Sequence, residues 1–205
     1  MKILVTRTIG LKQGILKNVL NQLLPFTGSM QFIEFQKPIM FEENYFVGED
    51  FFEVCSKFRL DNNINDEDYL IVLTELNNAD NWFSVFNSDG ERTIFIQTTD
   101  WENYIYCEPV FPVTYEIIAN IFQSIMFKDF DIYENGYIHD SSIGCMNDMC
   151  SWKPDISYKF RTADICQDCQ KLLLTKLSND YLIQGIEIFE TLRKKMVFNS
   201  NYQKS

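Results

Sequence analysis

The apolar positions of the first sixty residues follow two different spacings. Residues 2–8 and 30–35 are short runs rich in strand formers, which predicts two β-strands. Residues 11–24 and 49–60 instead repeat apolar side chains every three or four positions, which predicts two amphipathic helices. The first helix is expected to end at Pro25, because proline has no N–H to continue the hydrogen-bond ladder.

A third strand is predicted at residues 69–74, where the sequence YLIVLT is almost wholly apolar, as in a strand buried on both faces. Residues 82–86 and 93–97 flank a Ser-Asp-Gly turn, which predicts a β-hairpin. The order of strand, helix, strand, helix, strand and hairpin predicts an α/β (α+β) fold, in which helices pack on a mixed sheet.

A long helix is predicted from Pro112 to about Phe127. Its apolar side chains cover a wide surface, which is typical of a central, buried helix. Glu116 is its one charged residue, and a buried carboxylate requires a partner or an exit to solvent. Two amphipathic helices are predicted further along, at residues 170–177 and 181–198.

The chemistry of the chain is concentrated between His139 and Cys169. Cys145 and Cys150 form a C-x4-C pair, and Cys166 and Cys169 form a C-x2-C pair. Two close cysteine pairs separated by a short loop are typical of a tetrahedral Zn²⁺ site. Four thiolates leave no open coordination position, so we expect one structural zinc ion per chain, held by these four cysteines.

Two other interpretations of this segment remain open. The Cys166–Cys169 pair precedes a predicted helix, where a thiol pKa is lowered as redox chemistry requires, but Asp164 and Asp168 oppose thiolate formation. His139, the single histidine of the chain, could replace one cysteine as a ligand. We favour a surface or outer-shell role for this histidine, and the same for Asp148.

We expect an α/β core at residues 1–130 and, at residues 131–205, the zinc-binding segment with the C-terminal helices, packed together as one domain. The net charge of −11, from 18 Lys and Arg against 29 Asp and Glu, disfavours nucleic acid and anionic membranes. No segment has the length and composition of a membrane span or a signal peptide. With no signal peptide expected, the cysteines are assigned to a reducing cytoplasm, where paired Cys motifs indicate metal or redox chemistry rather than structural disulfides.

The order of these features resembles the zincin metallopeptidases, and most closely their archaemetzincin branch. Proteins of that branch have a sheet with an early helix, an edge hairpin, a buried active-site helix and then a zinc site of the form C-x4-C…C-x2-C. The four cysteines match that site one by one, and the layout is similar over about residues 1–170. The resemblance implies a zincin-like fold with a structural zinc.

The resemblance also implies a catalytic H-E-x-x-H motif on the buried helix, with a third histidine beyond it, and here the sequence departs from the pattern. The matching stretch is Tyr-Glu-Ile-Ile-Ala, so Tyr115 and Ala119 stand in the places of the two histidine ligands. Glu116 matches the general base, although a carboxylate in the first turn of a helix is also favoured by the helix dipole alone. One histidine in the whole chain excludes a catalytic zinc of that type.

The sequence therefore favours a non-catalytic zinc-binding protein, a pseudo-peptidase, that acts through protein–protein interaction. The acidic surface and the C-terminal helix at residues 181–198 are the expected contact surfaces. The alternative is a divergent metal-dependent peptidase or hydrolase that uses Glu116 with a different set of metal ligands.

Overall fold

The computed structural model describes residues 1–43, 45–127, 138–150 and 152–198. The chain divides into two compact units, Met1–Thr98 and Thr99–Ser205. A boundary near residue 130, as expected from the sequence, stays a prediction.

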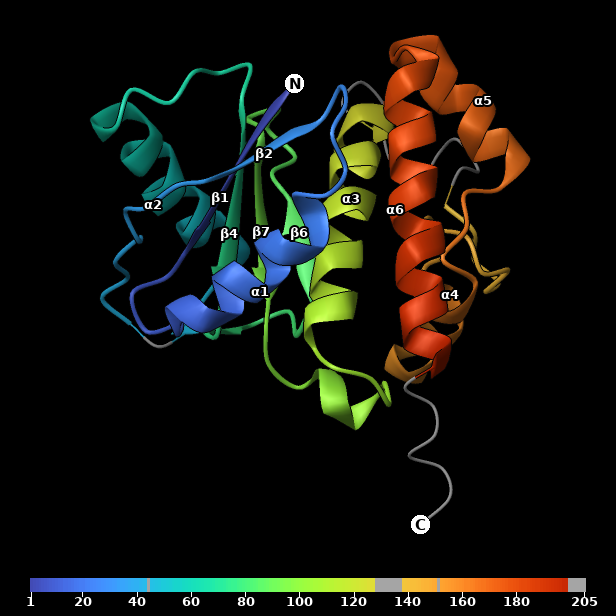
Figure 1. Cartoon of the computed structure of the whole chain (residues 1–205). Helices are drawn as coiled ribbons and strands as arrows, with labels where there is room; N and C mark the ends of the chain where they lie inside the picture. The colour runs from blue at the N-terminus through green and yellow to red at the C-terminus, as the bar shows by residue number, and fades with distance from the viewer. Residues whose placement is uncertain (44, 128–137, 151, 199–205) are drawn as a thin grey trace. The chain divides into compact units, whose positions relative to one another are not determined.

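The N-terminal unit is built on a five-stranded sheet in the order β2-β1-β4-β7-β6. Four neighbouring strands run parallel, and β6 lies antiparallel to β7 at one edge. A separate two-stranded parallel ribbon consists of β3 (Tyr45–Phe46) and β5 (Asn77–Asn78). The remaining elements are β1 (Lys2–Arg7), α1 (Gln13–Leu23), β2 (Gln31–Glu34), α2 (Gly48–Asp61), β4 (Tyr69–Thr74), β6 (Ser84–Phe86) and β7 (Thr93–Gln97) (Figure 1).

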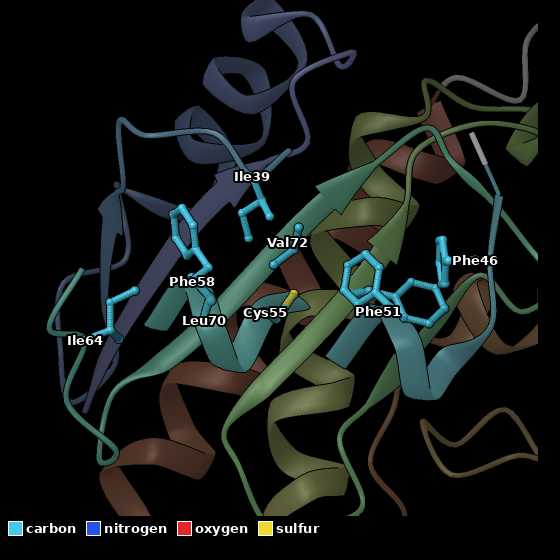
Figure 2. Packing of buried hydrophobic residues seen from close by; sticks show 9 residues of the cluster. Ile39, Phe46, Phe51, Cys55, Phe58, Ile64, Leu70 and Val72 are labelled. Carbon is cyan, nitrogen blue, oxygen red and sulfur yellow. The ribbon is translucent and has the colours of Figure 1, made fainter. Parts of the chain in front are cut away.

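The core on one side of this sheet forms where α2 covers the central strands. Successive side chains of a strand point to opposite faces, so Leu70 and Val72 of β4 share a face. Phe51 and Cys55 of α2 pack against that face, as Figure 2 shows. Every residue of β4 is buried, which agrees with the prediction of a strand covered on both faces.

The C-terminal unit contains helices and the cysteine-rich segment. Helix α6 runs beside α3 in the opposite direction, and α5 contacts both of them (Figure 1). The helices are η1 (Trp101–Asn103), α3 (Val110–Phe127), η2 (Lys153–Asp155), α4 (Ile156–Thr162), α5 (Gln167–Lys176) and α6 (Asn179–Phe198).

Helix α6 buries its apolar stripe within its own unit. Leu182, Phe189 and Leu192 are each less than 5% exposed. Gly185 lets the two helices approach closely, because a Cβ atom at this position would lie 2.4 Å from the ring of Phe122 in α3. The apolar face of α6, one of the two surfaces expected to contact a partner, is therefore occupied by internal packing.

Helix α3 is the central element of the C-terminal unit. Contrary to the expectation from the sequence, this one segment of the described residues has the length and composition of a membrane span. However, 78% of the stretch is buried inside the protein. Such burial is the property of a core helix, as predicted from its wide apolar surface. Its only charged residue, Glu116, is buried with it.

The mixed sheet, the edge hairpin and the packed helices agree with the fold class predicted from the sequence. The short helix α4 was not predicted, because its seven residues contain too few turns for a periodic pattern. Helix α5 begins at Gln167, three residues earlier than predicted, with Cys166 as its N-cap residue. Both differences concern the segment that holds the cysteines, where metal ligands rather than apolar periodicity dominate the sequence.

Replacing Gly185 by Ala should destabilise the protein, because the added methyl group meets Phe122 in the α3–α6 contact. The expected loss is about 1–3 kcal/mol in the free energy of unfolding, the usual cost of overpacking. Gly14→Ala in α1 is the matched control, since a Cβ there has no neighbour within 4 Å and should raise stability by up to about 1 kcal/mol. Chemical denaturation of both variants measures the difference. Equal stability changes would contradict the close packing at Gly185.

Candidate metal centre

Four potential ligand atoms come together in the C-terminal unit. The described residues contain one group of three or more His, Cys, Asp or Glu side chains able to hold a metal ion, and its members are His139, Cys145, Cys166 and Cys169. Their ligand atoms all lie within 4.8 Å of one another. Cys145 and Cys169 are buried, whereas His139 and Cys166 are partly exposed.

The dimensions of this group fit Zn²⁺. Zinc–sulfur bonds of 2.3 Å and zinc–nitrogen bonds of 2.0–2.1 Å place tetrahedral ligand atoms about 3.5–3.8 Å apart. The His139 Nε2 atom lies 3.7 Å from Cys166 Sγ and 3.8 Å from Cys169 Sγ. Three thiolates and one imidazole complete a tetrahedral shell, so this set leaves no position for a substrate or a water molecule. The prediction of a structural zinc site in this segment is confirmed.

The histidine is oriented by a buried carboxylate. Asp148 Oδ1 lies 3.1 Å from His139 Nδ1, and the Asp148 side chain is fully buried. A carboxylate accepts hydrogen bonds, so Nδ1 carries the proton and Nε2 presents its lone pair to the thiols. This is the usual way in which proteins fix a metal-binding imidazole.

The C-x2-C pair stands at the start of α5. Cys166 is its N-cap residue and Cys169 lies in its first turn, where the helix dipole stabilises negative charge. The backbone N–H of Cys166 donates to Cys145 Sγ at 3.4 Å. A hydrogen bond from the Cys169 thiol, helped by backbone N–H groups, lowers the pKa of Cys145, and the same bond raises the pKa of Cys169.

Asn147 lies in the C-x4-C loop and supports Cys169 of the C-x2-C pair. Its Nδ2 atom donates to Cys169 Sγ at 3.2 Å and lies 3.5 Å from the sulfur of Met126 in α3. The amide is buried beside the ligand group. Hydrogen bonds to a thiolate stabilise its charge, so Asn147 favours the ligand form of Cys169.

Cys150 is not a member of this ligand group, although the sequence predicts it as the fourth ligand. Its Sγ atom lies 3.7 Å from the carbonyl oxygen of Asp148. Burial raises its pKa to about 11, with a smaller opposing effect from Lys159. Ligation by Cys150 stays a prediction, and the structure instead brings together the alternative with His139 as ligand.

A glycine turn introduces the first cysteine pair. Gly144 has φ of +90°, and a Cβ atom there would lie 2.5 Å from Thr162 Cγ2 at the end of α4. Only glycine meets both conditions without strain. Thr162 also donates to the Gly144 carbonyl, so α4 fixes the position of the turn.

The part of α3 around Tyr115 and Ala119 has a closed, apolar environment. Tyr115 is fully buried and stacks on Phe189 at 4.5 Å between ring centroids, while Phe160 meets it edge-on at the same distance. Ala119, in the place of the second histidine, is also fully buried. Burial strongly raises the pKa of the Tyr115 hydroxyl, so this group stays neutral.

Glu116 is held by internal polar contacts. Asn120 Nδ2 donates to its Oε2 atom at 2.9 Å, and Lys159 Nζ from α4 lies 3.9 Å from its Oε1 atom. The glutamate is 3% exposed and the lysine 7% exposed. The positive charge of Lys159 offsets the negative charge of the buried carboxylate. This is the partner that the sequence analysis expected for Glu116.

The structure thus brings together three of the four predicted cysteine ligands and leaves Glu116 out of the metal centre. It adds His139 as a ligand atom and Asn147 and Asp148 as its supports. The signal for His139 was present in the sequence as a lone histidine six positions before the first cysteine. A role for Asp148 near the metal was among the expectations from the sequence, but its contact with His139 was not. The supporting role of Asn147 was not visible, since it depends on contacts with Met126 and Cys169, which lie 21 and 22 positions away in the sequence.

Removing the C-x2-C pair should remove the metal. We expect the variant with Cys166→Ser and Cys169→Ser to lose the single zinc ion and to unfold at lower temperature, because the metal ties α5 to the preceding segment. Cys107→Ser, at a half-buried cysteine outside the group, is the control. Elemental analysis and thermal unfolding measure both effects. Loss of zinc with unchanged stability would contradict a structural role.

Comparison with known proteins gives similarity at the level of structure. No protein-family model matches the sequence, and no curated protein matches it. Among solved structures, a zinc-dependent peptidase from Methanocorpusculum labreanum matches with a TM-score of 0.59 and 14% identity, over 83% of this chain and 99% of that one.

Two archaemetzincins match at a similar level. The protein from Methanopyrus kandleri has a TM-score of 0.55 and 14% identity, over 86% of this chain and 94% of that one. The protein from Archaeoglobus fulgidus, solved with malonate, has a TM-score of 0.54 and 9% identity, over 84% and 99%. The chain therefore has the fold of archaemetzincin-type zinc-dependent peptidases, as the sequence layout indicated.

Proposed function

We propose that this protein is a non-catalytic relative of the zincin peptidases, a zinc-binding pseudo-peptidase that acts by binding another protein in the cytoplasm. The zinc ion has a structural role in the C-terminal unit. The observation that carries the proposal is the environment of α3, where the residues matching a catalytic motif are packed in a protein core.

Catalysis by a zincin requires a glutamate that reaches a metal-bound water. Glu116 instead lies in a buried cluster with Asn120 and Lys159. The residues in the places of the histidine ligands, Tyr115 and Ala119, offer apolar surface and a neutral hydroxyl. These contacts favour a role of α3 in packing.

The supply of ligands also favours the proposal. The chain has one histidine, and its Nε2 atom faces the thiols of Cys166 and Cys169. A second metal of the zincin type would require imidazoles that the chain does not contain. The alternative, a divergent metal-dependent peptidase or hydrolase using Glu116, would have to assemble a carboxylate-rich site, and Lys159 already stands beside that carboxylate.

A candidate surface for the partner surrounds the β3–β5 ribbon. Tyr45, Val47 and Trp82 are 51%, 43% and 49% exposed. The two strands pair, Asn78 Nδ2 donates to the Trp82 carbonyl, and the Trp82 N–H donates to Asn78 Oδ1, so these segments are joined. We call this exposed group the ribbon surface.

The charge of the ribbon surface favours a basic partner. Glu49, Asp50 and Asp80 are exposed around it. Residues 38–56 and 75–91 contain no Lys or Arg. Exposed aromatic rings next to carboxylates suit lysine or arginine side chains, which bind the rings by cation–π contact and the carboxylates by charge. A protein with a positively charged segment fits this surface better than a nucleic acid does.

The cytoplasmic location is supported by the cysteines. All six are free thiols in the structure, and three of them belong to the metal group. Thiols in this arrangement persist in a reducing compartment, whereas oxidation would compete with metal binding.

The absence of catalysis can be tested with Glu116→Gln, which preserves the shape of the side chain. With excess zinc, wild type and variant should each bind one equivalent and should leave a mixed peptide library equally intact, as measured by mass spectrometry. Cys107→Ser, purified in the same way, is the control for zinc content and for cleavage by contaminating peptidases. Cleavage by the wild type that depends on Glu116, together with a second zinc equivalent, would support the peptidase alternative.

The partner proposal can be tested by cross-linking in cytosolic extract. We expect the double variant Trp82→Ala, Asp50→Lys to lose the basic partners that wild type captures, and capture by wild type to weaken as salt is raised. Leu60→Ser, a change at another exposed apolar residue, is the matched control. Capture that is unaffected by the double variant would exclude the ribbon surface.

A further inference from the structure

We propose that Asp148 selects the fourth metal ligand: it holds His139 in the ligand group and thereby leaves Cys150 outside it. The inference rests on the proposed zinc binding, and it is independent of the proposed partner. It assigns to one buried carboxylate the difference between a shell of three thiolates with one imidazole and a shell of four thiolates.

Each of the two carboxylate oxygens of Asp148 has its own partner. Oδ1 lies 3.1 Å from His139 Nδ1, and Oδ2 accepts a hydrogen bond from the Gly144 backbone N–H at 2.6 Å. The carboxylate therefore joins the histidine to the turn that precedes Cys145. Because the side chain is fully buried, water cannot replace either contact.

The backbone around Asp148 strengthens the same link. The N–H of His139 donates to the carbonyl of Asn147 at 3.1 Å, and the N–H of Met149 donates to the carbonyl of His139 at 3.0 Å. The histidine is thus bound to the interior of the C-x4-C loop on both sides of Asp148. The N–H of Asp148 also donates to the Cys145 carbonyl at 3.0 Å, which closes the loop into a turn.

These contacts give His139 an advantage over Cys150. The imidazole has a fixed orientation with its Nε2 lone pair directed at two thiols, 3.7 and 3.8 Å away. The Cys150 thiol is engaged with the carbonyl of Asp148, 3.7 Å from it. Without the Asp148 carboxylate the imidazole would lose its orienting partner, and the nearby cysteine would complete the shell as it does in a C-x4-C…C-x2-C site.

The single histidine makes a direct test feasible. The full-length protein, labelled with ¹⁵N-histidine and loaded with ¹¹³Cd²⁺, gives one pair of ring nitrogen signals. We expect the Nε2 signal of wild type to be split by coupling to ¹¹³Cd, with a protonated Nδ1. Cys150→Ser should show the same splitting and the same affinity in competition with a chelator.

In Asp148→Ala we expect the splitting to disappear and the metal affinity to fall by roughly 10- to 100-fold, the range typical for loss of such a supporting contact. The ¹¹³Cd signal should move to the position of a four-thiolate site, and adding Cys150→Ser to this variant should abolish that shift.

Three results would overturn the inference: an unsplit Nε2 signal in metal-loaded wild type, a loss of affinity in Cys150→Ser, or splitting that persists in Asp148→Ala. If Asp148→Ala does not fold, the measurements on wild type and Cys150→Ser still show whether His139 or Cys150 is the fourth ligand. Failure of wild type to bind any metal would refute the zinc site itself, whereas binding through four thiolates would refute only the role of Asp148.

Discussion

The convergence of one imidazole and three thiols is the interaction on which the C-terminal unit depends. The ligands come from His139, from the turn at Cys145 and from the start of α5. His139 and Cys145 lie outside the helices and strands, so a shared metal ion would tie them to the start of α5 and to the apolar core around it. The buried amide of Asn147 and carboxylate of Asp148 fix the donors from within the loop.

The proposed absence of catalysis rests on the packing of α3, the central helix of the same unit. This helix is buried and carries Tyr115 between two phenylalanine rings. A catalytic metal requires an open coordination position that water can reach, and such packing does not provide one. Lys159 provides the positive charge that a buried Glu116 requires, and it does so from α4, directly after the cysteine loop.

Much of this structure could be predicted from the sequence. Strands such as β4 and the amphipathic helices have clear apolar spacing, and the paired cysteines identify the metal and its place. Three of the four predicted ligands come together with His139, and ligation by Cys150 stays a prediction, because pair spacing alone could not decide between Cys150 and His139. That choice depends on the contact from Asp148 to His139 and on the turn at Gly144, which bring together residues that periodicity does not relate. Helix α4 was not predicted, because its seven residues are too few to show the apolar spacing of a helix.

The most direct test of a single, closed zinc site is X-ray absorption at the zinc edge on purified protein of known metal content. The structure predicts one zinc ion per chain with three sulfur ligands and one imidazole nitrogen, at about 2.3 Å and 2.0–2.1 Å respectively. A zinc ion coordinated mainly by nitrogen and oxygen, with a bound water, would contradict the account.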